Sequence, residues 1–324
     1  MSRLKRIVLL SLATSLIVPA ALAQNTNNAR PGTINYVEGQ ATLNGQPLST
    51  NSHGITEVPQ GQTLATENGK VEVLLTPGVF LRIGENSAVT MVSPDLTNTE
   101  VQLDRGTAEV EVDQIYKQND LLVDQGPAQT KLLKNGLYEF DANSNTMRVF
   151  DGEAAVSTSR NAKNWIKVKG HHEFALNGDQ QKPDSFKAEQ LASNDALYNW
   201  SKLRADYLGQ ANEQLAQQYA GAAGFYPGWY WDPGLYSYTW LPGDGLFWSP
   251  FGYGFYSPRY IYGGGFMYPA YRGGVYRGYV GHEPYHGSFG YRGGAVTGGH
   301  AFAGAGGFHG GSAGGGFHGG GGRR

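Results

Sequence analysis

The stretch HEPYH at residues 282–286 carries the residue types of a zinc protease. In the motif H-E-x-x-H, two histidines one helical turn apart bind zinc, and the glutamate activates water. Here Pro284 lies between His282 and His286, and glycines flank the stretch on both sides. An internal proline costs a helix about 3 kcal/mol and each glycine about 1 kcal/mol. We therefore expect no specific metal site, although the tail histidines remain candidates for loose metal binding.

Three carboxylates, Glu109, Glu111 and Asp113, alternate along one predicted strand. Alternate residues of a strand share a face, so the three resemble the acidic pair of a glycoside hydrolase. A polar strand face is also typical of the solvent side of a sheet, and that is the interpretation we favour. No G-x-S-x-G, P-loop or dinucleotide fingerprint occurs in the chain. The sequence therefore predicts no catalytic residue, no cofactor and no enzymatic activity.

Aromatic residues are dense in "GWYWDPGLYSYTWLPGDGLFWSPFGYGFYSP", residues 228–258. Their period-two spacing and the intervening proline–glycine turns predict short hairpins or an extended wrap with rings on one side. Such rings are either buried against the preceding domain or exposed as a stacking surface for sugars or a partner's apolar patch. Both interpretations can hold for different rings. The candidates for binding a partner or a glycan are Trp229, Trp231, Tyr238, Trp240, Trp248, Tyr253 and Tyr256.

Residues 1–23 have the pattern of an export signal. Arg3, Lys5 and Arg6 precede an apolar run over 7–19, and Ala21-Leu22-Ala23 provides small residues for cleavage. The run is shorter than the roughly 20 residues that span a bilayer. We expect a mature chain with no transmembrane segment, located in the periplasm or at the surface of a bacterium. The absence of cysteine agrees with a bacterial envelope protein, since exported eukaryotic proteins of this size usually carry disulfides.

After a linker over 24–30, residues 31–180 predict many short strands. Apolar residues alternate or run together in segments of about five residues, and turn dipeptides separate these segments. The dipeptides are Asn44-Gly45, Asn68-Gly69, Asn135-Gly136, Asp151-Gly152 and Asn177-Gly178. Asparagine and glycine tolerate the positive φ of tight hairpin turns. The fold class is therefore mainly β, a β-sandwich or short β-solenoid, followed by one or two α-helices and a disordered tail.

Residues 184–223 predict the helical segment. Apolar residues recur there every three or four positions, at Leu197, Trp200, Leu203, Tyr207, Ala211, Leu215 and Tyr219. We expect Ser193 or Asn194 to cap the helix and this stripe to pack on the β-domain or the aromatic segment over 225–258. The opposite face, which includes Lys202 and Arg204, reads as the solvated side.

The tail over 259–324 is rich in glycine and repeats "YRGG" and "GGFHGG". Such dense glycine cannot offset its backbone entropy by burial, which predicts disorder. Six arginines stand there against the single acid Glu283, whereas the preceding mature chain is acidic. The tail is therefore suited to self-association or to contact with an anionic envelope polymer. Arginine–tyrosine repeats also occur in RNA-binding tails, but an exported protein seldom meets nucleic acid.

The β-region resembles the FecR-type domain of bacterial envelope proteins. The resemblance rests on the order of "GTINYVEGQATLNG" (32–45), "VPQGQTLATENGKVEVLLTPGVFLRIGENSAVTM" (58–91), "VQLDRGTAEVEV" (101–112) and "GLYEFDANSNTMRVFDGEAAV" (136–156). It covers 31 to about 178. In the family's iron-transport regulators, such a domain receives a signal in the periplasm and passes it through a membrane helix to a sigma-factor-binding segment. Here a predicted signal peptide replaces that segment and helix.

The resemblance thus implies an extracytoplasmic β-module that binds partners, with no catalytic residues to inherit. We predict a non-enzymatic binding or scaffold protein of the cell envelope whose partners are envelope proteins or cell-wall polysaccharide. The alternative is a soluble sensor or adaptor in FecR-type transmembrane signalling.

Overall fold

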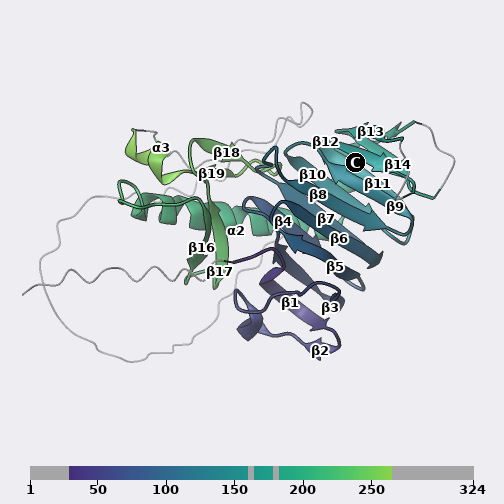
Figure 1. Cartoon of the computed structure of the whole chain (residues 1–324), viewed down its shortest axis with the longest axis horizontal. Helices are drawn as coiled ribbons and strands as arrows, with labels where there is room; N and C mark the ends of the chain where they lie inside the picture. The colour runs from purple at the N-terminus through teal and green to yellow at the C-terminus, as the bar shows by residue number, and fades with distance from the viewer. Residues whose placement is uncertain (1–28, 160–163, 178–181, 265–324) are drawn as a thin grey trace, which may run out of the picture. The chain divides into compact units, whose positions relative to one another are not determined.

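A computed structural model describes residues 29–159, 164–177 and 182–264 of the chain (Figure 1). The predicted signal peptide, most of the 24–30 linker and the glycine-rich tail beyond residue 264 lie outside the described residues. The described chain is mainly β with few helices, as the sequence predicts.

Fifteen strands form one sheet in the described residues. In chain order they are β1 Thr33–Leu43, β2 Gln46–Pro47, β3 Thr63–Leu74, β4 Val79–Ile83, β5 Ala88–Asp95, β6 Asn98–Arg105, β7 Thr107–Val112, β8 Asp120–Gln125, β9 Ala128–Leu132, β10 Gly136–Asp141, β11 Thr146–Asp151, β12 Glu153–Ser157, β13 Ile166–Lys169, β14 His172–Ala175 and β15 Asp184–Ser185. A short 3-10 turn, Thr50–Ser52, follows β2. The last strand, β15, lies inside the range that the sequence assigns to the helical segment, so the β-structure extends to residue 185.

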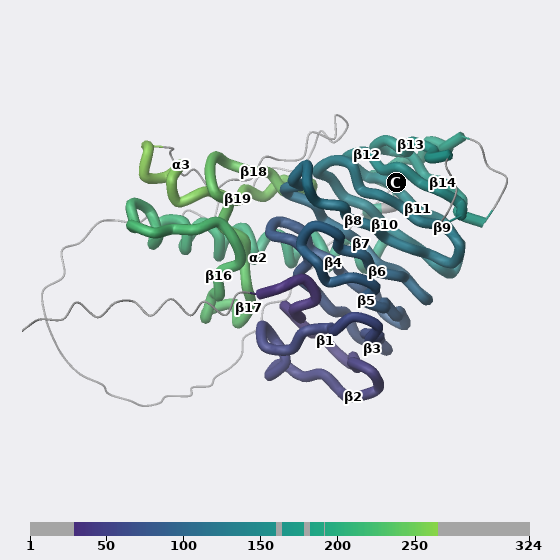
Figure 2. Tube along the Cα trace, in the orientation of Figure 1, coloured from purple at the N-terminus to yellow at the C-terminus, as the bar shows by residue number. Residues whose placement is uncertain are grey.

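The sheet folds over at β3. The first residues of β3 pair with β5 and its last residues pair with β4, while β1 occupies the other edge. One half continues from β4 through β7, β10, β11 and β14 to β15, and the other from β5 through β6, β8, β9 and β12 to β13. Every pairing is antiparallel except β6 with β8. The path can be followed in Figure 2.

The main hydrophobic core lies between these two halves. Val71 and Val110 from one half share a continuous buried cluster with Val101 and Val123 from the other. These residues come from the alternating apolar positions of the sequence, since every second side chain of a strand points to the same face. The sandwich alternative of the predicted fold class therefore describes the sheet.

Two of the predicted turn dipeptides have different roles. Asn44 and Gly45 both have positive φ and join β1 to β2, as predicted. Asn68-Gly69 instead lies inside β3, where Gly69 pairs with Gly39 of β1. A Cβ on Gly69 would lie 2.5 Å from the backbone nitrogen of Gln40, so this glycine permits a close approach of two strands rather than a turn.

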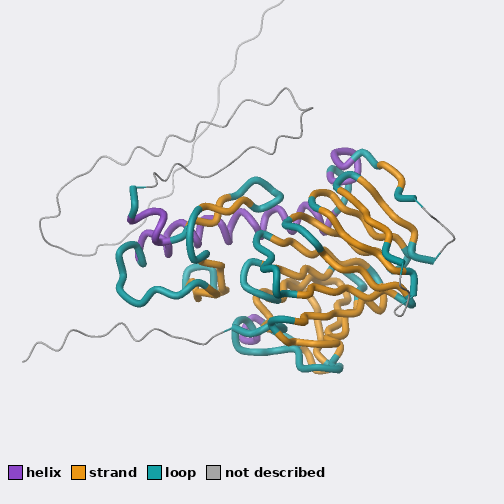
Figure 3. Tube along the Cα trace, turned by 45° about the horizontal axis from the view of Figure 1, so that its top comes forward, coloured by secondary structure: helices purple, strands orange, loops and turns teal. Residues whose placement is uncertain are grey.

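A second layer of structure covers the outer face of the β4–β7–β10–β11 half. It consists of α1 Ala188–Ala192, α2 Ala196–Gln218, the hairpin β16 Gly228–Asp232 with β17 Ser237–Leu241, the hairpin β18 Leu246–Trp248 with β19 Gly254–Tyr256, and α3 Pro258–Tyr262. The two hairpins lie on opposite sides of α2 (Figure 1), and Figure 3 shows the same long helix between short strands. The hairpins confirm the predicted turns of the aromatic segment, while α3 shows that regular structure continues past the predicted start of the tail at residue 259. No helix of the described residues is long and apolar enough to cross a membrane.

Helix α2 differs from its predicted form in two ways. Its N-cap is Asp195, whose carboxylate accepts hydrogen bonds from the backbone of Leu197 and Tyr198, so neither predicted residue caps it. The buried stripe is also rotated, because Leu203 and Tyr207 are exposed whereas Arg204 is buried. The sheet face beneath α2 carries buried acidic side chains, and α2 packs on it with Arg204, which pairs with Glu72.

Candidate functional site

A row of charged side chains crosses the sheet face beneath α2. Its members are direct partners in the strand register, from β3 through β4, β7, β10 and β11 to β14. In that order they are Glu72, Arg82, Glu109, Glu139, Arg148 and Glu173. Glu111 of β7 and Asp113, the residue directly after that strand, continue the same face at the next two alternate positions beyond Glu109. We call this set of eight residues the charged row.

Glu72 is the most heavily hydrogen-bonded member of the charged row. Its Oε2 accepts from Nε of Arg82 at 2.9 Å, and its Oε1 accepts from Nη2 of Arg204 at 2.8 Å and from Asn35 at 2.9 Å. Burial opposes ionisation, but the two guanidinium groups outweigh it and lower the pKa of Glu72 to about 2. Arg204 therefore ties α2 to the sheet, which contradicts its predicted place on the solvated helix face.

The carboxylates of β7 are buried. Glu109, Glu111 and Asp113 are all 0% exposed, which corrects the expectation of a solvent-facing strand. Glu111 accepts hydrogen bonds from Arg82 and from the hydroxyl of Ser249. The three residues do share one face of the strand, as predicted. The sequence pattern of that face does not indicate that the chain after residue 185 covers it. A glycoside-hydrolase pair needs contact with a sugar, and these covered groups offer none.

Burial also raises the pKa of Glu109 and Asp113. Desolvation raises the pKa of Glu109 well above its ordinary range, and the neighbouring Glu139 raises it further. Desolvation and Glu111 do the same to Asp113. A carboxyl that stays neutral avoids the cost of burying a charge. The charged row thus combines ion pairs, such as those of Arg82 with Glu72 and Glu111, with two acids whose pKa is raised by burial.

Glu139 predicts a pH dependence of stability. Burial and the nearby Asp195 raise its pKa from 4.5 to about 7, against the opposing effect of Arg148. Between these values the folded chain keeps a proton that the unfolded chain has released, so the free energy of unfolding falls as pH rises from 4.5 to about 7. Glu139→Gln is expected to flatten this decline, measured by urea unfolding across that range. The exposed control Glu57→Gln should keep it, and an unchanged decline in Glu139→Gln would contradict the account.

The predicted binding rings divide into two groups. Tyr238, Trp240 and Tyr256 are buried in the second layer and reach no external ligand in this arrangement. The other four predicted rings are half-buried, namely Trp229, Trp231, Trp248 and Tyr253. For these four the prediction of partner or glycan binding stays a prediction.

The hairpin β16–β17 explains this division. Trp229 pairs with Trp240 and Trp231 with Tyr238, so the four rings share one face, as the period-two spacing predicts. That face packs on the sandwich, where Trp229 meets Phe80 edge to face at 5.2 Å between ring centroids. Direct pairing places the rings together, but contact with the sheet buries most of their area.

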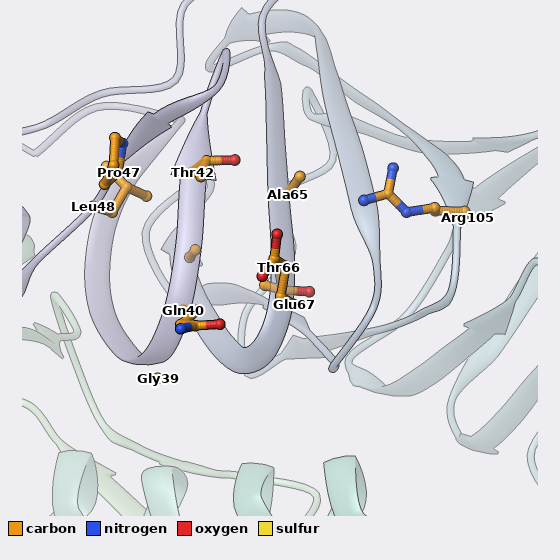
Figure 4. A pocket seen from close by; sticks show the side chains of 10 residues that line it. Gly39, Gln40, Thr42, Pro47, Leu48, Ala65, Thr66, Glu67 and Arg105 are labelled. Atoms are coloured by element: carbon orange, nitrogen blue, oxygen red, sulfur yellow. The ribbon is translucent and has the colours of Figure 1, made fainter.

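One shallow cleft lies between β1, β2 and β3 and has a volume of about 350 Å³. Figure 4 shows Gln40 and Thr42 on β1, Thr66 and Glu67 on β3, and Arg105 reaching towards them from β6. Its lining mixes polar and charged side chains with small apolar ones, and no aromatic ring lines it.

A second cleft, of about 400 Å³, lies between the segment that follows α2 and the helix α3. We call it the tyrosine cleft. Its lining is Tyr219, Gly221, Ala222, Gly224, Phe225, Tyr226, Pro258, Arg259 and Tyr262. Sequence reasoning missed this site, since its residues come from two segments more than 30 positions apart. The glycines at 221 and 224 follow the predicted helix and by their residue type indicate its end, which gives no sign of a cleft.

The remaining predicted chemistry falls outside the described residues. This applies to HEPYH at 282–286 and to the tail histidines. Within the described ranges no group of three histidine, aspartate or glutamate side chains is close enough to hold a metal ion.

Comparison with known proteins gives weak matches. No family model and no curated protein matches the chain. Two crystal structures from Parabacteroides distasonis, at 2.50 Å and 1.65 Å resolution and each described as a "putative anti-sigma factor", match with a TM-score of 0.34 and 12% identity. The matches cover 40% of this chain and only 62% and 63% of those chains. A likeness of this extent carries no argument about function, and the resemblance to the FecR-type domain stays a prediction.

Proposed function

We propose that the chain is a non-enzymatic binding protein of the bacterial cell envelope, which holds envelope polysaccharide or envelope proteins through its ordered body. The observation that carries this proposal is the tyrosine cleft. Tyr226 and Tyr262 at its walls are each 75% exposed, the highest values among the large apolar and aromatic side chains of the described residues. Aromatic rings left exposed around a cleft are typical of a binding site, since folding otherwise covers them.

The distribution of acids supports a binding role over catalysis. Burial raises the pKa of the Glu109 and Asp113 carboxyls well above the ordinary range, and both side chains are fully buried. A catalytic acid must touch its substrate, whereas these groups contact only the protein. Their place in the charged row gives them a structural part in holding the second layer on the sandwich.

The second layer is well suited to present a binding surface. Asn212 of α2 bonds to the backbone of both hairpins, through Trp240 at 2.7 Å and Tyr256 at 2.7 Å and 3.1 Å. Asn35 of β1 bonds to Tyr238 in both directions, at 2.7 Å and 2.9 Å. These bonds hold the hairpins to α2 and to the sandwich, so the backbone of the second layer loses little entropy when a ligand binds. In this proposal the tail adds weak multivalent contacts and self-association to a rigid binding body.

Affinity capture from the producing organism's envelope fraction tests the proposal. The baits are the chain over 24–324 and a shorter chain over 24–264, with captured protein and glycan both measured. We expect both baits to retain envelope material, and the longer bait to retain more because of its basic, aromatic tail. Capture by the longer bait alone would assign binding to the tail and overturn the proposal for the ordered body.

A further inference from the structure

The tyrosine cleft has an apolar floor between exposed aromatic walls. Phe225 is 6% exposed and Pro258 is buried, so these two side chains form a covered base. Tyr226 and Tyr262 stand at the opening and Tyr219 is half-buried beside them. A volume of about 400 Å³ falls within the range of small-ligand sites.

The local backbone shapes this cleft. Gly221 has φ +75°, and a Cβ there would lie 2.8 Å from the ring of Tyr262, so only glycine lets that ring lie against the chain. On α3, Arg259 and Tyr262 are three residues apart and therefore neighbours on one side of the helix. The ring and the guanidinium consequently line the same wall.

The lining of the cleft carries one positive charge. Arg259 is its one charged lining residue, and it is exposed. Within the described residues, no ion pair or hydrogen bond holds its guanidinium. A guanidinium offers paired donors that match a carboxylate, and tyrosine hydroxyls add donors and acceptors for sugar hydroxyls. The flat apolar face of a sugar ring is complementary in shape and polarity to an exposed tyrosine ring.

We propose that the tyrosine cleft binds a carboxylate-bearing sugar of an envelope polysaccharide, with Arg259 contacting the carboxylate and Tyr226 and Tyr262 stacking on the sugar rings. This inference rests on the proposed binding function and names the ligand of one site. The cleft is lined by loop and helix residues without a strand edge, so an extended acidic peptide would lack the backbone pairing that stabilises peptides on sheets. The observations therefore favour a sugar over a peptide.

Isothermal titration of the 24–324 chain tests the inference. The probes are tetragalacturonate, the neutral maltotetraose and tetraglutamate. We expect tetragalacturonate to bind most tightly, and Arg259→Gln to weaken that binding by about 10- to 100-fold, the usual effect of losing a hydrogen bond between charged groups. Tyr262→Ala should weaken it by about fivefold, through loss of one ring on which the sugar stacks.

Matched controls separate the cleft from the rest of the chain. Arg105→Gln removes an exposed arginine from the other cleft, and Tyr207→Ala removes an exposed ring from α2, so both should bind tetragalacturonate as the parent does. Every variant keeps the tail and its five further arginines, so their contribution cancels. Equal binding by Arg259→Gln and the parent, or no binding by the parent, would overturn the inference. Equal or tighter binding of tetraglutamate would replace the sugar by an acidic peptide.

Failure of this inference is distinguishable from failure of the proposed function. If the 24–264 chain captures envelope material and Arg259→Gln with Tyr262→Ala leaves that capture unchanged, the protein binds the envelope elsewhere and only the cleft assignment is wrong. If the 24–264 chain captures nothing, the proposed function itself is wrong.

Discussion

The variant Arg82→Met is expected to lose about 3–5 kcal/mol of unfolding free energy, because it leaves a buried carboxylate without its counter-charge. Arg82 is 0% exposed and bonds to both Glu72 and Glu111. Domain stabilities are about 5–15 kcal/mol, so a loss of this size removes a large share of the total. Urea unfolding followed by circular dichroism measures it.

Two further variants make this result specific to charge. Arg105→Met replaces an exposed arginine and should change stability by no more than about 0.5 kcal/mol. Adding Glu111→Gln to Arg82→Met removes the carboxylate that loses its counter-charge, whereas Glu72 keeps Arg204, so the double variant should recover part of the loss. If the double variant were no more stable than Arg82→Met, the loss would reflect packing and the role of the ion pair between Arg82 and Glu111 would be refuted.

The second large effect is expected at Trp240, where Trp240→Ala should cost about 3–5 kcal/mol through lost burial and an unfilled cavity. The ring is 0% exposed and lies 5.1 Å from Phe247 and 5.6 Å from Phe255, between centroids. It belongs to the buried cluster that joins the second layer to Leu74 and Phe80 of the sandwich. Chemical unfolding monitored by intrinsic fluorescence gives the loss, and amide hydrogen exchange shows whether the hairpins open first.

The conservative change provides a control for this prediction. Trp240→Phe keeps an aromatic ring and should cost clearly less than Trp240→Ala. Trp165→Ala, at an exposed position on the sandwich, should be close to neutral. A neutral Trp240→Ala would mean that the second layer is not docked on the sheet as described.

The sandwich was predictable from the sequence because its code is local. Val71 and Val110 occupy alternating positions, and period two assigns such residues to one face of a strand whatever the topology. The pairing of Trp229 with Trp240 follows from the same rule and from the turn between the strands. The pattern does not predict the folding of the sheet at β3, because that depends on β5 pairing with the first residues of β3 and β4 with the last ones.

The charged row shows where local patterns stop being informative. Glu109 and Glu111 have the sequence pattern of a solvated face, and Arg204 that of a solvated helix. Arg204 is buried because it pairs with Glu72, 132 positions earlier in the chain, at 2.8 Å, and Glu109 and Glu111 are buried because the segment after the sandwich covers their strand. One sequence without an alignment carries no sign of that pairing. The buried stripe of α2 was predicted wrongly because apolar spacing alone assigns Leu203 and Tyr207 to the core and takes no account of the charges on the sheet.

The candidate site was predictable only in kind. Aromatic residues in the C-terminal half were expected to bind, but Tyr238, Trp240 and Tyr256 are core residues and the tyrosine cleft uses others. Tyr226 and Arg259 meet because the chain returns to the end of α2 through two hairpins. This approach of the two segments is a property of the tertiary fold, and no sequence motif in either segment predicts it.

Co-sedimentation of the 24–264 chain with the insoluble envelope fraction of the producing organism tests the central claim most directly. The account predicts saturable sedimentation of the ordered body without its tail, and transfer of the Arg259→Gln, Tyr262→Ala double variant to the supernatant while Tyr207→Ala still sediments. A parent chain that stays in the supernatant at every concentration of envelope material would contradict the claim that the ordered body is a binding protein of the envelope.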